Sequence, residues 1–438
     1  MEMYRKQEKI IDGYFKEAVE WRRQLHKCPQ TGWLEYYATG FIADKLSGWG
    51  YSLLLGKDVI AAAKQIQLPD AQRHDEEYKR ALSFGVKEEF ISPAKGGFTG
   101  VVAVLKGDKP GPTVGFRFDI DSNEVCEAND SGHRPADEDF ISQNPGCAHM
   151  CGHDAHAATG LLLARYFSEN RDMIHGTVKL IFQPNEENLS GAAAMVSAGV
   201  VDDVDYLFGG HVGTSLKQIG QIAVNVNNIY PMSRFMVTYR GRAAHAAIRP
   251  DEGKNALLGA CTAVTNLYAI ARHGNGASQI NVGVMNAGTD WNVIADKASF
   301  RLETRGATDA INDYMVVRAK EIVTGVAMMY GLELEITPAA VACGGVNSPE
   351  LVALASKVAS ALPSVSQLLP EAGLNGSEDF TAMMKQVQNR GGKAMFVLYG
   401  TPTGGGHHNA AFDIDETVIA NSVKFLAAMY SEITMGQG

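Results

Sequence analysis

The sequence has little of what defines several protein classes. Only six of its 438 residues are cysteine and fifteen are proline, which excludes a disulfide-stabilised scaffold and a proline-rich disordered chain. The first ten residues lack the apolar stretch of a signal peptide, and no apolar run reaches the roughly 18 residues of a membrane-spanning helix. Basic residues number 39 against 49 acidic ones, which disfavours binding to nucleic acid or anionic lipid. We therefore expect a cytoplasmic globular protein without nucleic-acid or membrane partners.

The composition is otherwise ordinary, with 45% hydrophobic and 20% charged residues. A chain of 438 residues suggests two or three domains and a large core. Apolar residues three and four apart predict helices over Ile10–Leu25 and Tyr37–Trp49. The charged stretch 57–95 is interpreted as a helical surface insertion, most simply a solvated excursion without function.

Short apolar runs then alternate with helical patterns over most of the chain. We predict a helix over Ala155–Phe167 and buried strands over Val101–Leu105, Val114–Phe118, Val178–Phe182, Tyr206–Phe208 and Met395–Tyr399. This alternation predicts an α/β domain with a largely parallel sheet. We assign residues 1–224 and 341–438 to this domain.

Residues 225–340 have a different pattern, which predicts a small α+β domain inserted into the larger one. The expected elements are a strand over Ser233–Arg240, a helix containing Leu257 to Tyr268, strands over Ile280–Met285 and Ala298–Arg305, a helix over Ile311–Met329 and a strand over Leu332–Ile336. The order β-α-β-β-α-β is that of the split ferredoxin-like unit.

Acidic and imidazole side chains follow four of the predicted strands. They are Asp119 and Asp121, Glu186 and Glu187, His211, and the pair His407–His408. Ligands of open α/β sheets bind outside the carboxyl ends of the strands, so we expect these side chains to meet at one edge. Between the first two groups lies a run with two cysteines and three histidines, from Cys147 to His156.

Each of these residues taken singly has an ordinary structural explanation. A histidine at a strand end is often a hydrogen-bonded core residue, two glutamates can occupy the first turn of a helix, and cysteines can be small buried hydrophobes. The Cys–His run can also form a closed zinc knuckle. The combination favours a metal site, because imidazole, thiolate and carboxylate suit zinc or manganese and are too polar to be buried unpaired.

The adjacent carboxylates Glu186 and Glu187 indicate hydrolysis. Neighbouring side chains point in different directions, so one can bind metal while the other faces water. A metal ion lowers the pKa of bound water to about 7 in favourable sites, and a carboxylate can pass the released proton to a leaving amine. Amide hydrolysis needs this arrangement because an unprotonated amine leaves poorly.

The segment His149-Met150-Cys151-Gly152-His153-Asp154 resembles the metal motif His-Ala-Cys-Gly-His-Asp of the di-metal exopeptidases and amidohydrolases. That family includes aminoacylases, carboxypeptidase G, hippurate hydrolases and auxin-conjugate amidohydrolases. Less specific matches at 21–23, 96–100, 198–205, 281–285 and 303–307 extend the resemblance over nearly the whole chain. The resemblance implies an α/β fold: a three-layer zinc-exopeptidase-like catalytic domain with an inserted α+β ferredoxin-like lid and dimerisation domain.

The resemblance also assigns roles in the catalytic domain. It implies two divalent ions, manganese or zinc, with Glu186 as the general base and Cys147 as a bystander. The C-terminal ligand of the family precedes an asparagine and an aromatic residue, which selects His408 over His407. The implied metal ligands are Cys151, His153, Glu187, His211 and His408.

In the inserted domain the resemblance implies three residues that act on the substrate. His245 ends a Gly-x-x-x-His motif, whose histidine polarises the scissile carbonyl, often from the neighbouring subunit. Asn292 opens Asn-Val-Ile-Ala, where the family has Asn-Val-Ile-Pro. Arg305, thirteen residues later, matches the arginine that binds the substrate carboxylate, a role that suits the planar guanidinium. Without the resemblance, Arg305 is equally well a surface arginine of a strand.

We therefore predict a di-metal amidohydrolase that cleaves an N-acyl amino acid, with an aroyl-glutamate as the expected substrate. The alternatives are a hippurate-like or N-acetyl-amino-acid deacylase, and an inactive metal- or partner-binding homologue, against which the intact Glu186 argues. The expected assembly is a homodimer or a heterodimer with a paralogous B subunit. The family often has alanine where Asn185 stands, a difference expected to affect the lining of the pocket.

Overall fold

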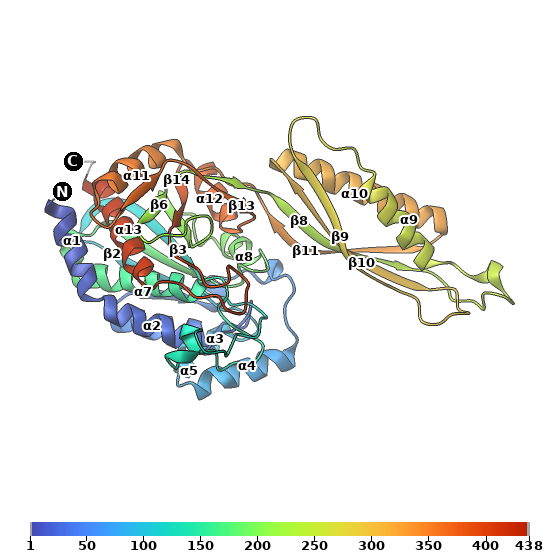
Figure 1. The fold of residues 1–438 in the computed structure, drawn as a ribbon, viewed down its shortest axis with the longest axis horizontal. Helices are drawn as coiled ribbons and strands as arrows, with labels where there is room; N and C mark the ends of the chain where they lie inside the picture. The colour runs from blue at the N-terminus through green and yellow to red at the C-terminus, as the bar shows by residue number, and fades with distance from the viewer. Residues whose placement is uncertain (1, 436–438) are drawn as a thin grey trace. The chain divides into compact units, whose positions relative to one another are not determined.

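The computed structural model describes residues 2–435, which form two compact units (Figure 1). Unit 1 contains the chain up to Asn227, Gly345–Leu374, and the chain from Asp379 onwards. Unit 2 contains Asn228–Gly344 and Asn375–Glu378. The last segment lies outside the 225–340 assigned from sequence. It belongs to unit 2 because the backbone N–H of Tyr230 donates to the carbonyl of Gly376 at 2.8 Å.

Unit 1 contains most of the helices and an eight-stranded sheet. Before unit 2 its elements are α1 (Glu2–Gly13), α2 (Phe15–Lys27), α3 (Tyr36–Gly48), β1 (Ser52–Leu55), α4 (Ala71–Ser83), α5 (Glu88–Ile91), β2 (Val101–Lys106), β3 (Lys109–Asp119), α6 (Arg134–Asp137), α7 (His153–Glu169), β4 (His175–Gln183), α8 (Gly191–Ser197), β5 (Tyr206–Val212) and β6 (Gln221–Ala223). After unit 2 they are α11 (Pro349–Ala361), β12 (Gln367–Leu369), α12 (Phe380–Asn389), β14 (Lys393–Tyr399) and α13 (Thr417–Met435).

The sheet of unit 1 has the strand order β1-β2-β4-β3-β5-β14-β6-β12. Its four central strands, β4, β3, β5 and β14, are parallel, whereas β2 pairs antiparallel with β4 and β6 antiparallel with β14. The carboxyl ends of the four central strands therefore lie at one edge, where ligands of such sheets bind.

Side chains of β3 alternate between two helical layers, as the period of two along a strand requires. Phe118 faces α7, where a Cβ on Gly160 would come within 2.6 Å of its ring. Arg117 points the other way and lies 5.6 Å from the ring centroid of Phe380 on α12. The three layers predicted from the sequence are confirmed.

Two sequence expectations for the N-terminal region were wrong in detail. The helix expected over Ile10–Leu25 is two helices, because the chain breaks at Tyr14 between α1 and α2. The insertion 57–95 is helical but is not a solvated excursion. It buries Tyr78, Ala81 and other apolar side chains in the main core, and the indole N–H of Trp33 donates to the carbonyl of Ile66 at 2.8 Å.

Unit 2 is a four-stranded antiparallel sheet with two helices on one face. Its elements are β8 (Met232–Arg240), α9 (Ala256–Tyr268), β9 (Ser278–Ala287), β10 (Lys297–Gly306), α10 (Asp309–Tyr330) and β11 (Glu333–Ala342), with strand order β11-β8-β10-β9. The predicted β-α-β-β-α-β order is present. Phe300 and Leu302 of β10 pack in the core with α9 and α10, whereas Arg301, Glu303 and Arg305 alternate with them on the open face.

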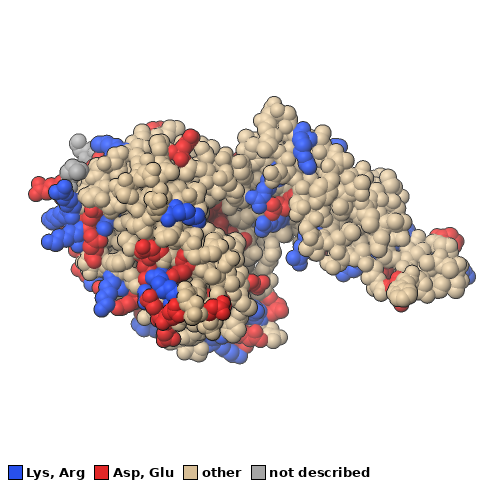
Figure 2. All heavy atoms as spheres, in the orientation of Figure 1, with Lys and Arg blue, Asp and Glu red and all other residues tan. Residues whose placement is uncertain are grey.

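Where the chain passes between the units, β7 (Val226–Ile229) pairs with β13 (Ala372–Gly376). None of the helices within residues 2–435 has the length and apolar character needed to cross a membrane. Figure 2 shows acidic and basic side chains interspersed over the face in view.

Candidate metal centre

The predicted metal ligands of unit 1 come from one edge of its sheet. Glu186 and Glu187 follow β4, and His211 lies near the end of β5. Cys151 and His153 flank Gly152, which precedes α7 with φ of 88°. This left-handed conformation suits glycine, and a Cβ there would lie 2.8 Å from a methyl of Val212. The turn between the two ligands therefore requires Gly152.

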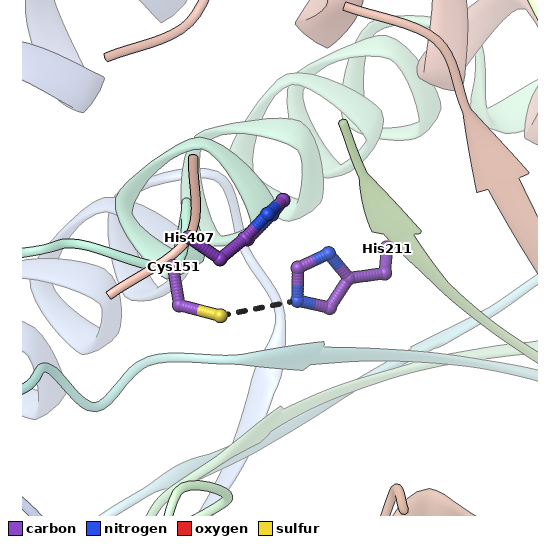
Figure 3. A group of neighbouring side chains, drawn as sticks. All are labelled: Cys151, His211 and His407. Carbon is purple, nitrogen blue, oxygen red and sulfur yellow. Dashed lines mark hydrogen bonds between the residues drawn. The ribbon is translucent and has the colours of Figure 1, made fainter. Parts of the chain in front are cut away.

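Cys151, His211 and His407 form one group whose nitrogen and sulfur atoms lie within 4.8 Å of one another (Figure 3). The Sγ of Cys151 lies 3.4 Å from Nε2 of His211. The Nδ1–H of His211 donates to the carbonyl of Val212 at 2.9 Å, and that bond leaves Nε2 directed at the thiol. Such a bond is the usual way in which a metal-binding imidazole is oriented.

Cys151, His153 and Glu187 form a second group, in which one candidate ligand atom from each residue lies within 4.8 Å of the others. Asp121 orients the other two residues of this group, His153 and Glu187. It accepts from Nδ1 of His153 at 3.0 Å and from the backbone N–H of Glu187 at 2.9 Å. The remaining Nε2 of His153 and Oε1 of Glu187 are buried and have no hydrogen-bond partner within residues 2–435. Buried polar atoms without partners are costly, so this donor set fits a divalent cation.

The electrostatics of the group favour a positive charge at the same place. Burial lowers the pKa of His153, but the charge of Asp119 and the hydrogen bond to Asp121 outweigh it and raise this pKa to about 10. Burial raises the pKa of Glu187, but its hydrogen bond with His408 and the charge of His153 lower it to about 2. The carboxylates around His153 would equally stabilise a metal ion.

Both C-terminal histidines lie beside the groups. The Nε2 of His407 bonds the carbonyl of Val212 at 3.1 Å, and burial lowers the pKa of its ring to about 4. His408 has φ of 60°, and its Nε2 lies 3.3 Å from Oε2 of Glu187. The geometry brings His407 to Cys151 and His408 to Glu187, so the choice of His408 as ligand stays a prediction.

Glu186 is buried beside the second group, as a general base would be. Its Oε2 lies 3.9 Å from Nε2 of His153, and its side chain is 10% exposed. The structure therefore brings together six of the predicted site residues: Cys151, His153, Glu186, Glu187, His211 and His408.

His156 was not predicted as a site residue but lies against the first group. Its ring centroid is 4.7 Å from that of His211. The Nδ1–H donates to Asp119 at 2.5 Å, and Nε2 accepts from the backbone N–H of Val212 at 3.2 Å. Because both nitrogens are occupied, His156 positions its neighbours. Both residues stand out in the sequence, because Asp119 ends a predicted strand and His156 lies in the Cys–His run. Their spacing in the sequence did not reveal that they pair with each other.

Glu35 is a second site residue that the sequence pattern did not reveal. Its carboxylate accepts from the backbone N–H of Asn185 at 2.8 Å and from Oγ1 of Thr99 at 2.6 Å. Asn185 precedes Glu186 and has φ of 52°, a conformation that asparagine tolerates better than most residues. Burial and the charge of Asp121 raise the pKa of Glu35 to about 8. Glu35 thus holds the loop that carries both glutamates.

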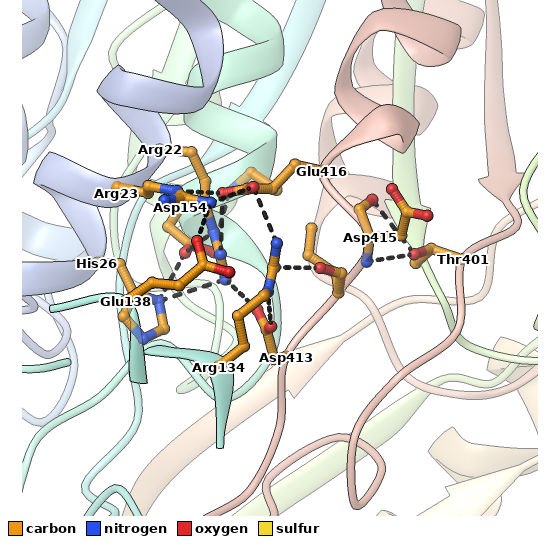
Figure 4. Close-up of polar contacts among 12 residues, drawn as sticks. Arg22, Arg23, His26, Arg134, Glu138, Asp154, Thr401, Asp413, Asp415 and Glu416 are labelled. Carbon is orange, nitrogen blue, oxygen red and sulfur yellow. Dashed lines mark hydrogen bonds and ion pairs between the residues drawn. The ribbon is translucent and has the colours of Figure 1, made fainter. Parts of the chain in front are cut away.

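A buried ion network holds the other side of the metal motif (Figure 4). Arg22 of α2 donates through Nε to Asp154 at 2.7 Å, and Asp154 directly follows His153. The same guanidinium bonds Asp413 at 2.9 Å and Glu416 at 3.3 Å. Burial raises the pKa of Asp154, but the charge of Arg22 and a hydrogen bond with His26 outweigh it and hold the pKa well below its ordinary value. Residues 21–23, one of the stretches that resemble the family, thus include an arginine that supports the metal motif through Asp154.

The predicted substrate residues of unit 2 lie in two separate places. His245 and Asn292 are both exposed, with Nδ2 of Asn292 3.5 Å from Nε2 of His245. They lie in the loops beyond Arg240 and before Lys297, at one end of the sheet. Arg305 lies near the opposite end of β10, eight residues after Lys297. At about 3.3 Å per residue, the part of β10 from Lys297 to Arg305 is roughly 26 Å long. Arg305 is therefore separated by about this length from the end of the sheet where His245 and Asn292 lie.

A three-layer fold with thiol, imidazole and carboxylate groups at its parallel strand ends defines a metallohydrolase. The model of peptidase family M20/M25/M40 matches residues 115–432, and the chain belongs to this family. Two relatives match nearly full length. Indole-3-acetyl-aspartic acid hydrolase of Enterobacter agglomerans is 44% identical over 94% of each chain. One of the subunits of p-aminobenzoyl-glutamate hydrolase from Escherichia coli is 42% identical over 95% of this chain and 96% of its own.

A solved structure shares the fold over both units. The crystal structure of an aminobenzoyl-glutamate utilization protein from Klebsiella pneumoniae has a TM-score of 0.82 and 36% identity. It covers 98% of this chain and 97% of its own. The predicted three-layer domain with a ferredoxin-like insertion is thereby confirmed.

Proposed function

We propose that this protein is a metal-dependent amidohydrolase that cleaves p-aminobenzoyl-glutamate into p-aminobenzoate and glutamate. The observation that carries the proposal is a pair of buried side-chain atoms, Nε2 of His153 and Oε1 of Glu187, which lie beside Glu186 and have no hydrogen-bond partner among the described residues. The relatives support the substrate class, since those named above are a hydrolase of an N-acyl glutamate and one of an N-acyl aspartate. The second of these substrates, indole-3-acetyl-aspartate, is the second candidate.

Two divalent ions, manganese or zinc, are proposed as cofactors. Cys151 belongs to both donor groups, so its sulfur would contribute to holding the metal on either side. The proposed ligands are Cys151, His153, Glu187, His211 and His408. When bound, the ions supply water of lowered pKa and polarise the amide carbonyl.

The protein's own groups carry out the remaining steps. Glu186 accepts the proton of the attacking water and transfers it to the amide nitrogen, so that glutamate leaves as an amine. Asp121 keeps His153 and Glu187 in place through its two hydrogen bonds. Arg305 binds the carboxylate of the amino acid, and His245 with Asn292 binds the carbonyl oxygen of the scissile amide.

The position of His245 supports an assembly of two chains. His245 and Arg305 lie at opposite ends of β10, so one copy of unit 2 does not place both on one small substrate. A second chain, either a copy or a paralogous B subunit, would supply the His245–Asn292 pair. Strand β9 ends the sheet order, and apolar side chains near it are exposed: Leu258, Tyr268, Val284, Met285 and Trp291. Such an edge is suited to pairing.

A cytoplasmic location is part of the proposal. Among the described cysteines, Cys28, Cys126, Cys147, Cys151 and Cys261 take no part in a disulfide, which suits a reducing compartment.

The test is mass spectrometry of the products from a panel of N-acyl amino acids, with manganese and with zinc. The panel contains p-aminobenzoyl-glutamate, indole-3-acetyl-aspartate, hippurate and N-acetyl-glutamate. We expect fastest release from the first. Fastest release from hippurate or N-acetyl-glutamate would replace the substrate but keep the chemistry. No release from any of them, with both metals bound, would mean a binding homologue and overturn the proposal.

A further inference from the structure

Unit 2 contains a pocket of about 270 Å³ on the open face of its sheet. It lies at the end of the sheet opposite His245, where β9 begins and β10 ends. The pocket is lined by Arg272, Gln279, Asn281, Glu303, Arg305 and the start of β9. Its volume is just below the roughly 300–1,000 Å³ of sites for drug-sized ligands, so it suits a fragment the size of an amino acid.

The side chain of Arg305 lines this pocket and is held in one orientation by Glu303. Its Nε donates to Oε1 of Glu303 at 2.6 Å, and Oε2 of the same carboxylate accepts from Nε of Arg234 at 2.7 Å. Burial raises the pKa of Glu303, but the hydrogen bonds from both arginines lower it below its ordinary value, so the carboxylate stays ionised. The Nη groups of Arg305 have no partner among the described residues and remain able to bind a carboxylate.

Arg272 lines the same pocket from the loop after α9. Its side chain has neither a hydrogen bond nor an ion pair with any residue from 2 to 435, whereas Glu303 is held by two arginines. The charged residues that line the pocket are Arg272, Arg305 and Glu303. Arg234 lies outside this lining and offsets the charge of Glu303, so the two positive charges of Arg272 and Arg305 remain for an amino-acid moiety with two carboxylates.

We propose that this pocket binds the amino-acid half of an N-acyl aspartate or glutamate, and that Arg272 binds its side-chain carboxylate. The inference rests on the proposed function, in which Arg305 binds the α-carboxylate. Gln279 and Asn281, which pair with Arg305 and Glu303 across the sheet, add side-chain amides to the lining of the pocket. Arg272 thereby determines the preference for acidic amino acids over neutral ones of the same shape.

The other arginines of this face are less suited to the role. Arg234 is committed to Glu303 through its Nε. Arg301 shares the face of Glu303 and Arg305 but does not line the pocket. Arg301→Gln is therefore the matched control for loss of one positive charge from the same sheet face.

The experiment compares Arg272→Gln, Arg272→Lys and Arg301→Gln with the unaltered protein. The probes are N-(4-aminobenzoyl)-glutamate and N-(4-aminobenzoyl)-glutamine, which differ only in the side-chain carboxylate. We expect Arg272→Gln to lower kcat/KM for the glutamate compound by roughly 10- to 100-fold, as for a lost charged hydrogen bond. The glutamine compound should be little affected, Arg272→Lys should retain part of the preference, and Arg301→Gln all of it.

Dissociation constants for both compounds are measured in parallel by calorimetry in the Glu186→Gln background, where no turnover is needed. The inference is overturned if Arg272→Gln keeps the full glutamate preference, or if it weakens both compounds equally. If the unaltered protein hydrolyses neither compound, the proposed function fails, but the ratio of dissociation constants still decides the role of Arg272.

Discussion

The site residues of unit 1 and those of unit 2 differ in how firmly the fold holds them. His153 is 1% exposed, and its Nδ1 is fixed by Asp121 at 3.0 Å. His245 is exposed, and its contact with Asn292 is a long 3.5 Å. Unit 1 thus holds its candidate ligands in fixed positions, whereas the His245–Asn292 pair of unit 2 is exposed and loosely held.

This contrast supports the different tasks proposed for the two units. Groups that bind metal and move protons must be held in fixed positions, because small misplacements cost rate. Groups that close over a substrate must be able to approach and leave, and exposed loops allow this. Substitutions of the buried site residues in unit 1 and of the exposed site residues in unit 2 should therefore alter different measured properties.

Glu186→Gln is expected to have the largest effect. It removes the proton acceptor but keeps the shape of the side chain, so kcat should fall by about 10²–10⁴-fold. Metal content, measured by plasma mass spectrometry, should stay at two ions per chain. Near-normal turnover with full metal content would show that another group acts as the base.

His245→Gln should lower kcat by about 10²–10³-fold, as for loss of one donor to a developing oxyanion. The sharper measurement mixes this variant with Glu186→Gln after joint refolding. If His245 acts on the site of the other chain, mixed dimers contain one intact site and recover activity. If it acts within its own chain, every mixed dimer has two damaged sites and none is recovered.

Cys151→Ser tests whether the buried groups hold metal. It should weaken metal binding by more than the roughly 10- to 100-fold typical of losing an outer hydrogen-bond partner. Cys147 is the matched control, since its Sγ lies 3.0 Å from Oγ of Ser122 and in neither donor group. Equal metal loss from Cys147→Ser would favour a zinc knuckle. His407→Gln and His408→Gln, compared in the same titration, decide between the two histidines.

Glu35→Gln is expected to have the smallest effect on turnover but a distinct effect on stability. Its pKa is about 8 in the folded state against 4.5 ordinarily. Between these values the folded state holds a proton that the unfolded state has released, so the free energy of unfolding falls as pH rises. The slope is on the order of 1.4 kcal/mol per pH unit. Urea unfolding at pH 5 and pH 8 should show this decline, and Glu35→Gln should flatten it.

Local sequence patterns were enough to predict much of the fold and which neighbouring residues of the candidate metal centre lie together. The strand Val114–Phe118 lies within β3 and the helix Ala155–Phe167 within α7, because periodicity and burial are local signals. The proximity of Cys151 and His153 was predictable because two residues of one turn necessarily lie together, whereas their role as ligands came from the family resemblance and stays a prediction. His407 and His408 were predictable as a pair, but a single pattern did not show which one faces Cys151.

The meeting of four strand ends was predictable from the sheet, but individual side-chain pairs between distant segments were not. Glu35 binds Asn185 across 150 residues, and nothing in either segment names the other. The break at Tyr14 is hidden in the sequence because the apolar periodicity continues through it. Fourteen of the 39 residues of 57–95 are charged and indicate a surface excursion, whereas its apolar residues fix the stretch to the core.

The network around Arg22 has a consequence for the biosynthesis of the protein. Arg22 leaves the ribosome 391 residues before Asp413 and 394 before Glu416. At about 5–20 residues per second, translation separates these partners by roughly 20 to 80 s. The segment 149–154 is made later than Arg22, and 259 residues separate Asp154 from Asp413, so this segment lacks the carboxylates that complete its support for roughly 13 to 52 s. The order of synthesis therefore favours metal loading after translation, once the C-terminal segment has closed over α2.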